Sequence, residues 1–332
     1  MLKYCIKRIL LAVGILFGVS VLLYFLVCQI DVNGIWEKIP KGIELEGTPE
    51  EMYAKMAAQL GIPAKNDLWG MIKGYCGWLW GVVRGDFGTS IKYELPVEEV
   101  IFKNMGVSFA VSLISTVLQL VIAIPLGIKC ACNQYGKLDY TATFLTMIGI
   151  SFPTFFLANI AIKIFAVELD WLPVGGLGLA QLSDTATWWD KMTTIAYHLI
   201  MPIGVLVVLS IGSWSRYTRT NTLEVLNADY IRTARAKGLS ERSVVYKHVF
   251  RNTMIPLVTV LAGTLPSLFG GAMITETIFA LPGVGNVAYQ AMLAGDIPFI
   301  MGYNMFIAVL TVLGILLTDI MYAVVDPRVK LA

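Results

Sequence analysis

The chain has 332 residues, of which 57% are hydrophobic and 14% are charged, and its mean hydropathy is +0.71. Because soluble domains carry roughly 25% charged residues, this composition excludes a soluble enzyme, a nucleic-acid-binding domain and a disordered chain. The formal net charge of +2 gives no reason to expect a polyanionic partner. The five cysteines are scattered, and no P-loop or metalloprotease motif occurs, so the sequence predicts neither a metal site nor an ATPase site in this chain.

Six apolar runs are long enough to cross a membrane, which takes about 20 mostly apolar residues. They lie near 9–30, 107–128, 141–167, 195–214, 254–274 and 303–325. The first run is longer than the apolar core of a signal peptide and lacks a cleavage site after it, so we expect a retained helix. The sequence therefore predicts an all-α polytopic membrane protein with six transmembrane helices.

Three regions follow from this pattern. We expect residues 1–30 to form the N-terminus and first transmembrane helix, and 105–332 to form a five-helix core. The polar segment between them, 31–104, is expected outside the cell with short helices and without a core of its own. Within it, Thr48-Pro49-Glu50-Glu51 predicts a helix start, and the Trp-rich stretch at 67–83 predicts a helix at the membrane interface.

The distribution of Lys and Arg predicts the orientation. Fifteen of them lie at the two termini and in the loops 129–139 and 215–253, whereas the short loops on the other side hold Lys191 alone. Cytoplasmic loops carry an excess of positive residues. We therefore expect both termini and the basic loops in the cytoplasm, whereas the segment 31–104 is long enough to be exempt from the rule.

The loop at 215–253 is too long and too patterned for a simple connector. Asp229 is placed to begin a short helix, and Gly238 is a natural residue to end it before a second helix that runs to about 250. One interpretation is an interfacial helix held by lipid phosphates. The other is a docking element, because small residues such as Ala234 and Gly238 permit close approach by a partner protein.

The segment at 230–239 reads YIRTARAKGL and resembles the cytoplasmic coupling motif of binding-protein-dependent ABC importer permeases. Its form is that of the B-type subunits of the peptide/nickel branch, the oligopeptide and dipeptide permeases. Further segments fit this family in the same order: Gly85 to Ser90, Trp171 to Pro173, Glu276, Leu281 to Gly285, and Tyr322 with Asp326 to Arg328. Arg232 stands where the general motif has Glu, which is typical of the peptide branch, and Asp31 to Gly34 depart from the family pattern.

The resemblance implies a type I ABC importer permease fold and one half of a translocation path for peptides. Implied partners are a homologous second permease, two cytoplasmic ATPase subunits that bind ATP and Mg²⁺, an external substrate-binding protein and the lipid of a bacterial plasma membrane. It implies no cofactor in this chain and no nucleic acid. Nickel chelates, glutathione and other small solutes are alternative substrates.

The resemblance assigns ATPase coupling to Arg232, Thr233, Ala234, Arg235, Ala236, Lys237, Gly238 and Leu239. Ala234 and Gly238 lie on one helix face at a spacing of four, so we expect that face to dock. Arg235 lies beside this face, which predicts that it is the direct contact and that Lys237 is peripheral.

Three ionisable residues in or near the spans are candidates for a path or gate. Lys163 either contacts the path or a partner, or it snorkels to the interface or pairs with Glu168. Asp319 either faces a helix interface or the path, or it forms a hydrogen bond between subunits. Glu276 either lines an external gate or is a solvated carboxylate at a helix end. Another class of function, an ion-coupled secondary transporter or a channel, predicts buried ionisable clusters at the membrane midplane, which these isolated residues do not form.

Overall fold

A computed structural model describes residues 2–29, 51, 57, 58, 60, 68–183 and 185–325. Within these residues the chain is helical, and one isolated antiparallel bridge, between Thr89 and Pro96, is its only extended pairing. The all-α class is therefore confirmed. The helix start expected at Thr48 to Glu51 lies largely outside the described residues, as do Asp31 to Gly34 and Asp326 to Arg328.

Six groups of helices account for the expected spans. They are α1 (Leu2–Gln29), α5 (Val97–Cys132), α6 (Lys137–Ser151) with α7 (Thr154–Ala161), α8 (Trp188–Leu226), α11 (Phe250–Gly270) with α12 (Met273–Ile278), and α14 (Ile297–Val325). Among the described residues, four helices are long and apolar enough to cross a membrane, and the number rises to six if each of two bent pairs is one span. The remaining elements are α4 (Leu68–Val83), α9 (Asp229–Ala236), α10 (Glu241–Ser243), α13 (Val284–Leu293), the π-helical segments at Ile162–Glu168 and Val244–Val249, and a 3₁₀ turn at Leu179–Gln181.

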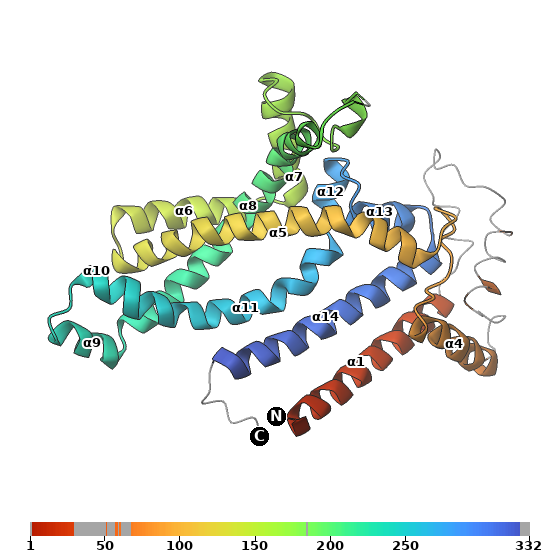
Figure 1. Ribbon diagram of the computed structural model, residues 1–332, viewed down its shortest axis with the longest axis horizontal. Coiled ribbons are helices and arrows are strands. Elements are labelled where there is room, and N and C mark those ends of the chain that lie inside the picture. Colours follow the sequence, from red (N-terminus) through yellow and green to blue (C-terminus); the bar gives the residue numbers. More distant parts are fainter. Residues whose placement is uncertain are drawn as a thin grey trace.

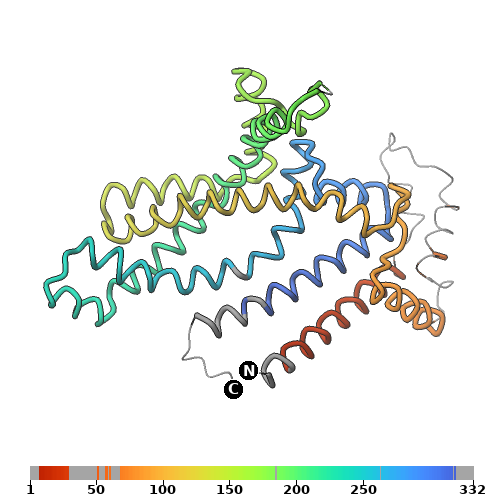
Figure 2. The backbone as a smooth tube through the Cα atoms, in the orientation of Figure 1, coloured from red at the N-terminus to blue at the C-terminus, as the bar shows by residue number. Residues whose placement is uncertain are grey.

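The six groups run back and forth along one direction (Figures 1 and 2). α5, α8 and α14 run toward the end of the molecule where α9 and α10 lie, and α1, α6 and α11 run away from it. α4 and α13 lie at the opposite end. Because consecutive helix groups run in opposite directions, successive connecting segments lie at alternate ends of the bundle. A chain with six membrane-spanning runs requires this arrangement.

The third expected span is not one straight helix. α6 ends at Ser151, and the helix pair Lys137–Ser151 and Thr154–Glu168 is bent by 100°. Pro153 lies at the bend with φ −60° and ψ 141°. A proline cannot donate an amide hydrogen bond and pushes the preceding residue out of the helical region, so α6 ends before it. α7 and the first turns of α8 consequently project away from the other helices (Figure 1).

Close packing joins α5 to α8. A Cβ atom on Gly127 of α5 would lie 2.6 Å from the Ser215 carbonyl oxygen of α8, so only glycine allows this approach. Gly212 of α8 meets α6 in the same way, since a Cβ there would lie 2.8 Å from the Thr146 carbonyl oxygen. Small residues that let backbones approach are a common basis of helix packing in membranes.

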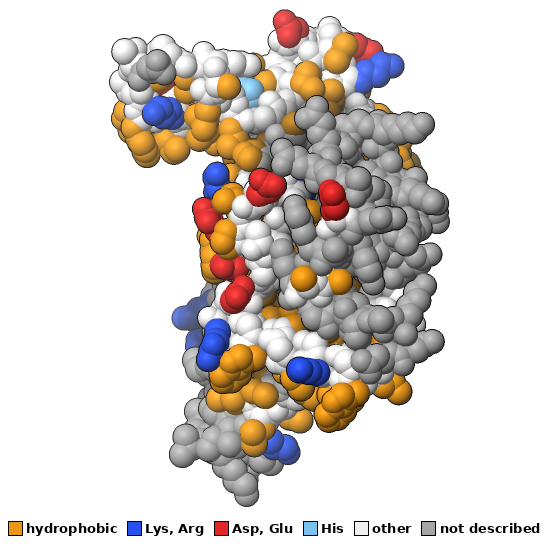
Figure 3. All heavy atoms as spheres, turned by 90° about the vertical axis from the view of Figure 1, so that its right-hand side faces the viewer, with side chains coloured by type: hydrophobic (Ala, Val, Ile, Leu, Met, Phe, Trp, Pro, Cys, Tyr) orange, Lys and Arg blue, Asp and Glu red, His pale blue; other side chains and the backbone are white. Residues whose placement is uncertain are grey.

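The helix predicted at 67–83 is present as α4, whereas its place at a membrane interface stays a prediction. Its Tyr75 and Trp78 are buried against Tyr24 of α1, and the Tyr75 hydroxyl lies 2.8 Å from that of Ser20. Outside such clusters, many large apolar side chains are exposed, for example Leu10 at 67% and Val121 at 63%. In the view of Figure 3, hydrophobic side chains form broad groups on the surface, as a helix bundle in lipid requires.

Candidate functional site

The segment 229–250 forms a helix, a glycine break and a second helical stretch, as the sequence predicts. α9 ends at Ala236, and Gly238 has φ +78° with no atom within 4 Å of an added Cβ. The Ser240 hydroxyl then accepts the Ser243 amide at 3.4 Å and caps α10. The left-handed backbone at Gly238 turns the chain, so the second stretch folds back beside α9.

α9 is attached to the end of α8 by an apolar cluster. Ile231 is fully buried and Ala234 is 7% exposed, and both pack with Val244 and Val249 against the last turn of α8. The expectation that Ala234 lies on an open docking face is therefore wrong in this structure. Ile231 lies three residues before Ala234 on the same helix face, and its larger apolar side chain turns that face inward.

The exposed side of α9 is polar. Its exposed residues include Tyr230, Arg232, Thr233, Arg235, Ala236 and Lys237, followed by Gly238 and Leu239. Arg235 is fixed in place by Glu241, which accepts hydrogen bonds from Nε at 2.7 Å and from a terminal guanidinium nitrogen at 3.3 Å. The Arg232 guanidinium lies 3.6 Å from the Asp229 carboxylate, and both of these side chains are exposed. A partner would therefore meet α9 on the face opposite Ala234.

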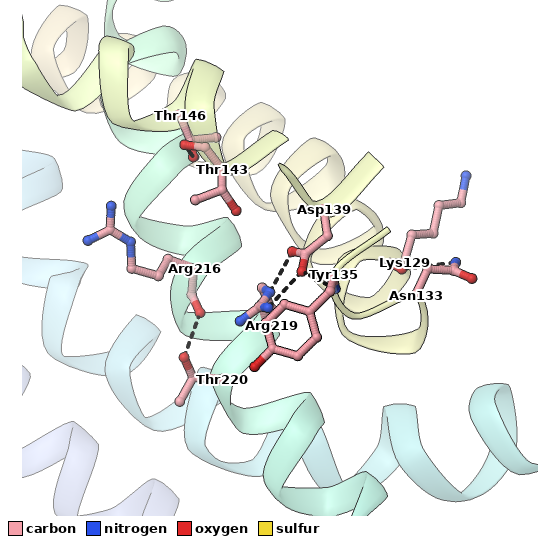
Figure 4. A network of polar contacts seen from close by, with 9 residues as sticks. All are labelled: Lys129, Asn133, Tyr135, Asp139, Thr143, Thr146, Arg216, Arg219 and Thr220. Atoms are coloured by element: carbon pink, nitrogen blue, oxygen red, sulfur yellow. Dashed lines mark hydrogen bonds and ion pairs between the residues drawn. The ribbon is translucent and has the colours of Figure 1, made fainter. Parts of the chain in front are cut away.

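An ion pair with a buried carboxylate holds the last part of α8 against α6. Asp139 in the first turn of α6 receives two hydrogen bonds of 2.7 Å from the Arg219 guanidinium on α8 (Figure 4). The Asp139 side chain is 5% exposed and that of Arg219 is 25% exposed. Asp139 also accepts the Tyr135 amide at 3.0 Å, which closes the turn between α5 and α6. The pair therefore joins three helices just before α9 begins.

Glu276 is buried completely, at the end of α11–α12 away from α9. One carboxylate oxygen accepts the Ala272 amide at 2.9 Å and the other accepts the Asn286 amide at 3.0 Å, in the first turn of α13. A Cβ on Gly283 would overlap this carboxylate, and one on Gly285 would lie 2.8 Å from it. The alternative of a solvated carboxylate is therefore wrong, because the glycine loop folds over the side chain. A role at an external gate stays a prediction.

Lys163, the second candidate path residue, does not join Glu276. Lys163 Nζ lies 3.8 Å from Glu168, with both side chains more than half exposed, which confirms the pairing alternative. Asp319 lies within α14, and its side chain is outside the described part of the structure. Among the described residues no group of three or more His, Cys, Asp or Glu is placed to hold a metal ion.

Sequence reasoning also missed a third buried carboxylate, Asp296, at the start of α14. It accepts hydrogen bonds from the Ser90 hydroxyl, from the Lys92 amide at 3.1 Å and from the Phe299 amide at 3.1 Å. Burial lowers the pKa of the nearby Lys92 ammonium, and burial followed by the charge of Asp296 raises the pKa of Tyr93 to about 12. Asp296 therefore fixes the loop before α5 to the α13–α14 junction. Its partners Ser90 and Lys92 lie 206 and 204 positions earlier in the chain, so sequence inspection does not reveal the contact.

Two comparisons place this architecture among known proteins. Residues 123–331 match the family model described as the inner membrane component of binding-protein-dependent transport systems. The oligopeptide transport system permease protein AppB of Bacillus subtilis (strain 168) is 37% identical over 340 residues, which cover 99% of this chain and 100% of that protein. The dipeptide transport system permease protein DppB of Escherichia coli (strain K12) is 31% identical over 345 residues, 99% of each chain.

Both relatives match along essentially their whole length, and the family model spans more than half of the chain. The helices that carry α9, the Asp139–Arg219 pair and the Glu276 loop all lie in the matched region. The chain belongs to the family of binding-protein-dependent transport system inner membrane components.

Proposed function

We propose that this chain is one of the two membrane-spanning permease subunits of an ATP-driven peptide importer. The similarity to oligopeptide and dipeptide permeases over the whole chain supports peptides as the substrate class. The other proposed components are a homologous second permease, two ATPase subunits that bind ATP and Mg²⁺, and an external substrate-binding protein. The proposed location is the cytoplasmic membrane of a bacterium.

The proposed fold is that of a type I ABC importer permease with six spans and both termini in the cytoplasm. Counting α6–α7 and α11–α12 as one bent span each gives six alternating passes. The fifteen Lys and Arg on one side support a cytoplasmic position for α9. α1 runs away from the α9 end and α14 returns toward it (Figure 1), which agrees with two termini on that same side.

The observation that carries the proposal is the way α9 is attached. Its buried face, Ile231 and Ala234, is fixed to the end of α8, whereas its polar face is open. A force applied to the open face therefore passes into α8. From there it reaches α6 through the Asp139–Arg219 pair and α5 through the close contact at Gly127.

We propose that ATP-driven closure of the ATPase subunits displaces α9 and that α5, α6 and α8 move with it as one unit. Two such units, one from each permease, would open the path first to the outside and then to the cytoplasm. Packed interfaces have discrete arrangements and do not deform continuously, so rotation of whole helix groups is the motion that this packing favours. The external binding protein would deliver its peptide to the outward-open state.

Uptake into proteoliposomes tests the proposal. The chain is co-purified with its second permease and ATPase subunits, reconstituted, and supplied with binding protein and a labelled tripeptide. We expect uptake that requires ATP and is unchanged by dissipating ion gradients. Uptake without ATP, driven by an ion gradient, would instead identify a secondary transporter. ATP-dependent uptake of nickel chelates or of the γ-linked peptide glutathione, but not of the α-linked tripeptide, would reassign the substrate.

A further inference from the structure

A polar cleft lies between the middle parts of α5 and α8 and the last two turns of α11. It has a volume of about 250 Å³, and its lining includes Ser112, Thr116 and Gln119 of α5, Ser210 of α8, and Thr264 and Ser267 of α11. On α5 these residues follow one another at spacings of four and three, so they share one helix face. Polar side chains of three apolar helices thus meet in the cleft.

Three of these hydroxyl groups are available to a solute. The hydroxyls of Ser115, Thr264 and Ser267 donate to carbonyl oxygens of their own helices. Within the described residues, Ser112, Thr116 and Ser210 make no such bond. Serine and threonine in a helix usually bond back to the preceding turn, so free hydroxyls that point into a shared cleft need water or a solute.

The lining carries no charge. Its hydrogen-bonding groups are hydroxyls, the Gln119 amide, the Trp214 indole and the backbone, with no Asp, Glu, Lys, Arg or His among the residues of the cleft. In a low-dielectric surrounding a fixed charge holds an opposite charge strongly and repels a like charge. A lining of neutral donors and acceptors instead exchanges hydrogen bonds with amide groups, whatever charge the side chains of the solute carry.

One wall of the cleft is a helix break. α11 ends at Gly270, and Gly271, with φ +78°, and Ala272 line the cleft before α12 begins. Glu276 holds this break, because it accepts the Ala272 amide at 2.9 Å and occupies the position beside Gly271 where a Cβ would lie. Non-helical backbone at membrane depth is tolerated where protein or a water-filled cavity surrounds it.

We infer that this cleft is the part of the translocation path that this subunit contributes, and that it contacts the passing solute through uncharged hydrogen bonds to main-chain amides. The inference rests on the proposed function, from which it takes the peptide class. It assigns path contacts to Ser112, Thr116 and Ser210, and it removes Lys163 from the path, since that residue does not line the cleft. It predicts tolerance of peptides with different side-chain charges.

Cysteine labelling tests whether the cleft is wet and open. In a complex whose native cysteines are replaced, Thr116→Cys is compared with Val117→Cys, which lies at the same depth of α5 and is 49% exposed on an apolar surface. A small charged thiosulfonate reacts with thiolates, which do not form in lipid, so we expect Thr116→Cys to react about tenfold faster or more. Equal rates would show that the cleft is closed off or filled by the second permease, and would overturn the inference.

Charge selection tests whether the solute passes through. We compare Ser210→Asp with the control Ser213→Asp, an exposed serine of α8 that does not line the cleft. Uptake of neutral, Lys-containing and Glu-containing tripeptides is measured relative to the parent complex. Ser210→Asp should disfavour the Glu-containing peptide against the Lys-containing one by about fivefold or more, whereas Ser213→Asp should change all three alike.

An equal effect of Ser210→Asp on all three peptides would contradict a path through the cleft. The failure of the proposed function gives a different result, because the parent complex would then take up none of the three tripeptides. In that case the labelling rates at Thr116 and Val117 still decide whether the cleft is part of an aqueous path.

Discussion

The Asp139–Arg219 pair offers the sharpest test of the connection between α9 and the membrane helices. Removing one partner of a buried ion pair costs about 3–5 kcal/mol because the other charge is left buried, whereas an exposed pair contributes about 0–1 kcal/mol. Asp139 is 5% exposed but Arg219 is a quarter exposed. We therefore expect Asp139→Asn and Arg219→Gln each to lower the free energy of unfolding by about 2–3 kcal/mol.

The free energies are measured by unfolding the reconstituted permease pair in mixed micelles with increasing dodecyl sulfate. The double variant should cost less than the sum of the two single changes, with a coupling energy of about 2 kcal/mol. Arg216→Gln is the matched control, because Arg216 is an exposed arginine one turn earlier on α8 that points away from Asp139 (Figure 4). Its expected cost is below about 0.5 kcal/mol.

The same variants report on coupling. If the pair passes motion from α8 to α6, Asp139→Asn should reduce the stimulation of ATPase activity by loaded binding protein more than it reduces basal activity. A cost equal to that of Arg216→Gln would show that the pair is solvated. An Asp139→Asn complex that is stable and keeps the full stimulation of ATPase activity by loaded binding protein would show that the motion bypasses α6. Either result would refute the reasoning.

Three further predictions concern the loop structures at the two ends. Gly238→Val should abolish uptake without loss of membrane insertion, because the left-handed backbone there costs a branched residue about 1–2 kcal/mol and the second stretch would move away from α9; wild-type uptake at equal expression would contradict this. Arg235→Glu should uncouple the ATPases, and the exchange Arg235→Glu with Glu241→Arg should restore coupling if the role of Arg235 is to fix the loop; no restoration would assign Arg235 to a direct contact instead. Gly283→Ala should destabilise the complex, because the added Cβ overlaps the Glu276 carboxylate. In thermal inactivation, the double variant with Glu276→Ala should lose little more stability than Gly283→Ala alone; additive losses would show that the two residues do not contact each other.

The sequence predicted what depends on local patterns. Apolar runs of sufficient length gave the main helices, and Gly238 marked the break between the two helical stretches of the segment 229–250. The Trp-rich stretch became α4. Each of these signals is carried by residues close together in the chain, so no tertiary contact was needed to interpret it.

Features that depend on distant contacts were not predictable in the same way. Ala234 is turned inward because Ile231, on the same helix face, packs against the end of α8. The composition of the segment does not reveal this contact. Glu276 is buried because a loop ten residues later folds over it. The cleft hydroxyls of α5 and of α11 have helical spacing in the sequence, and α8 adds Ser210, but only their meeting in one cleft distinguishes them from ordinary polar residues in a helix.

The central claim is that ATPase subunits act on this chain through the open face of α9. It is tested most directly by placing a photoreactive amino acid at Thr233, on the open face, and at Ala234, on the buried face, in the assembled importer. We predict that Thr233 crosslinks to an ATPase subunit with a yield that changes between the ATP-bound and nucleotide-free states, and that Ala234 crosslinks within its own chain. Equal crosslinking to the ATPase from both positions, or none from Thr233, would contradict the account.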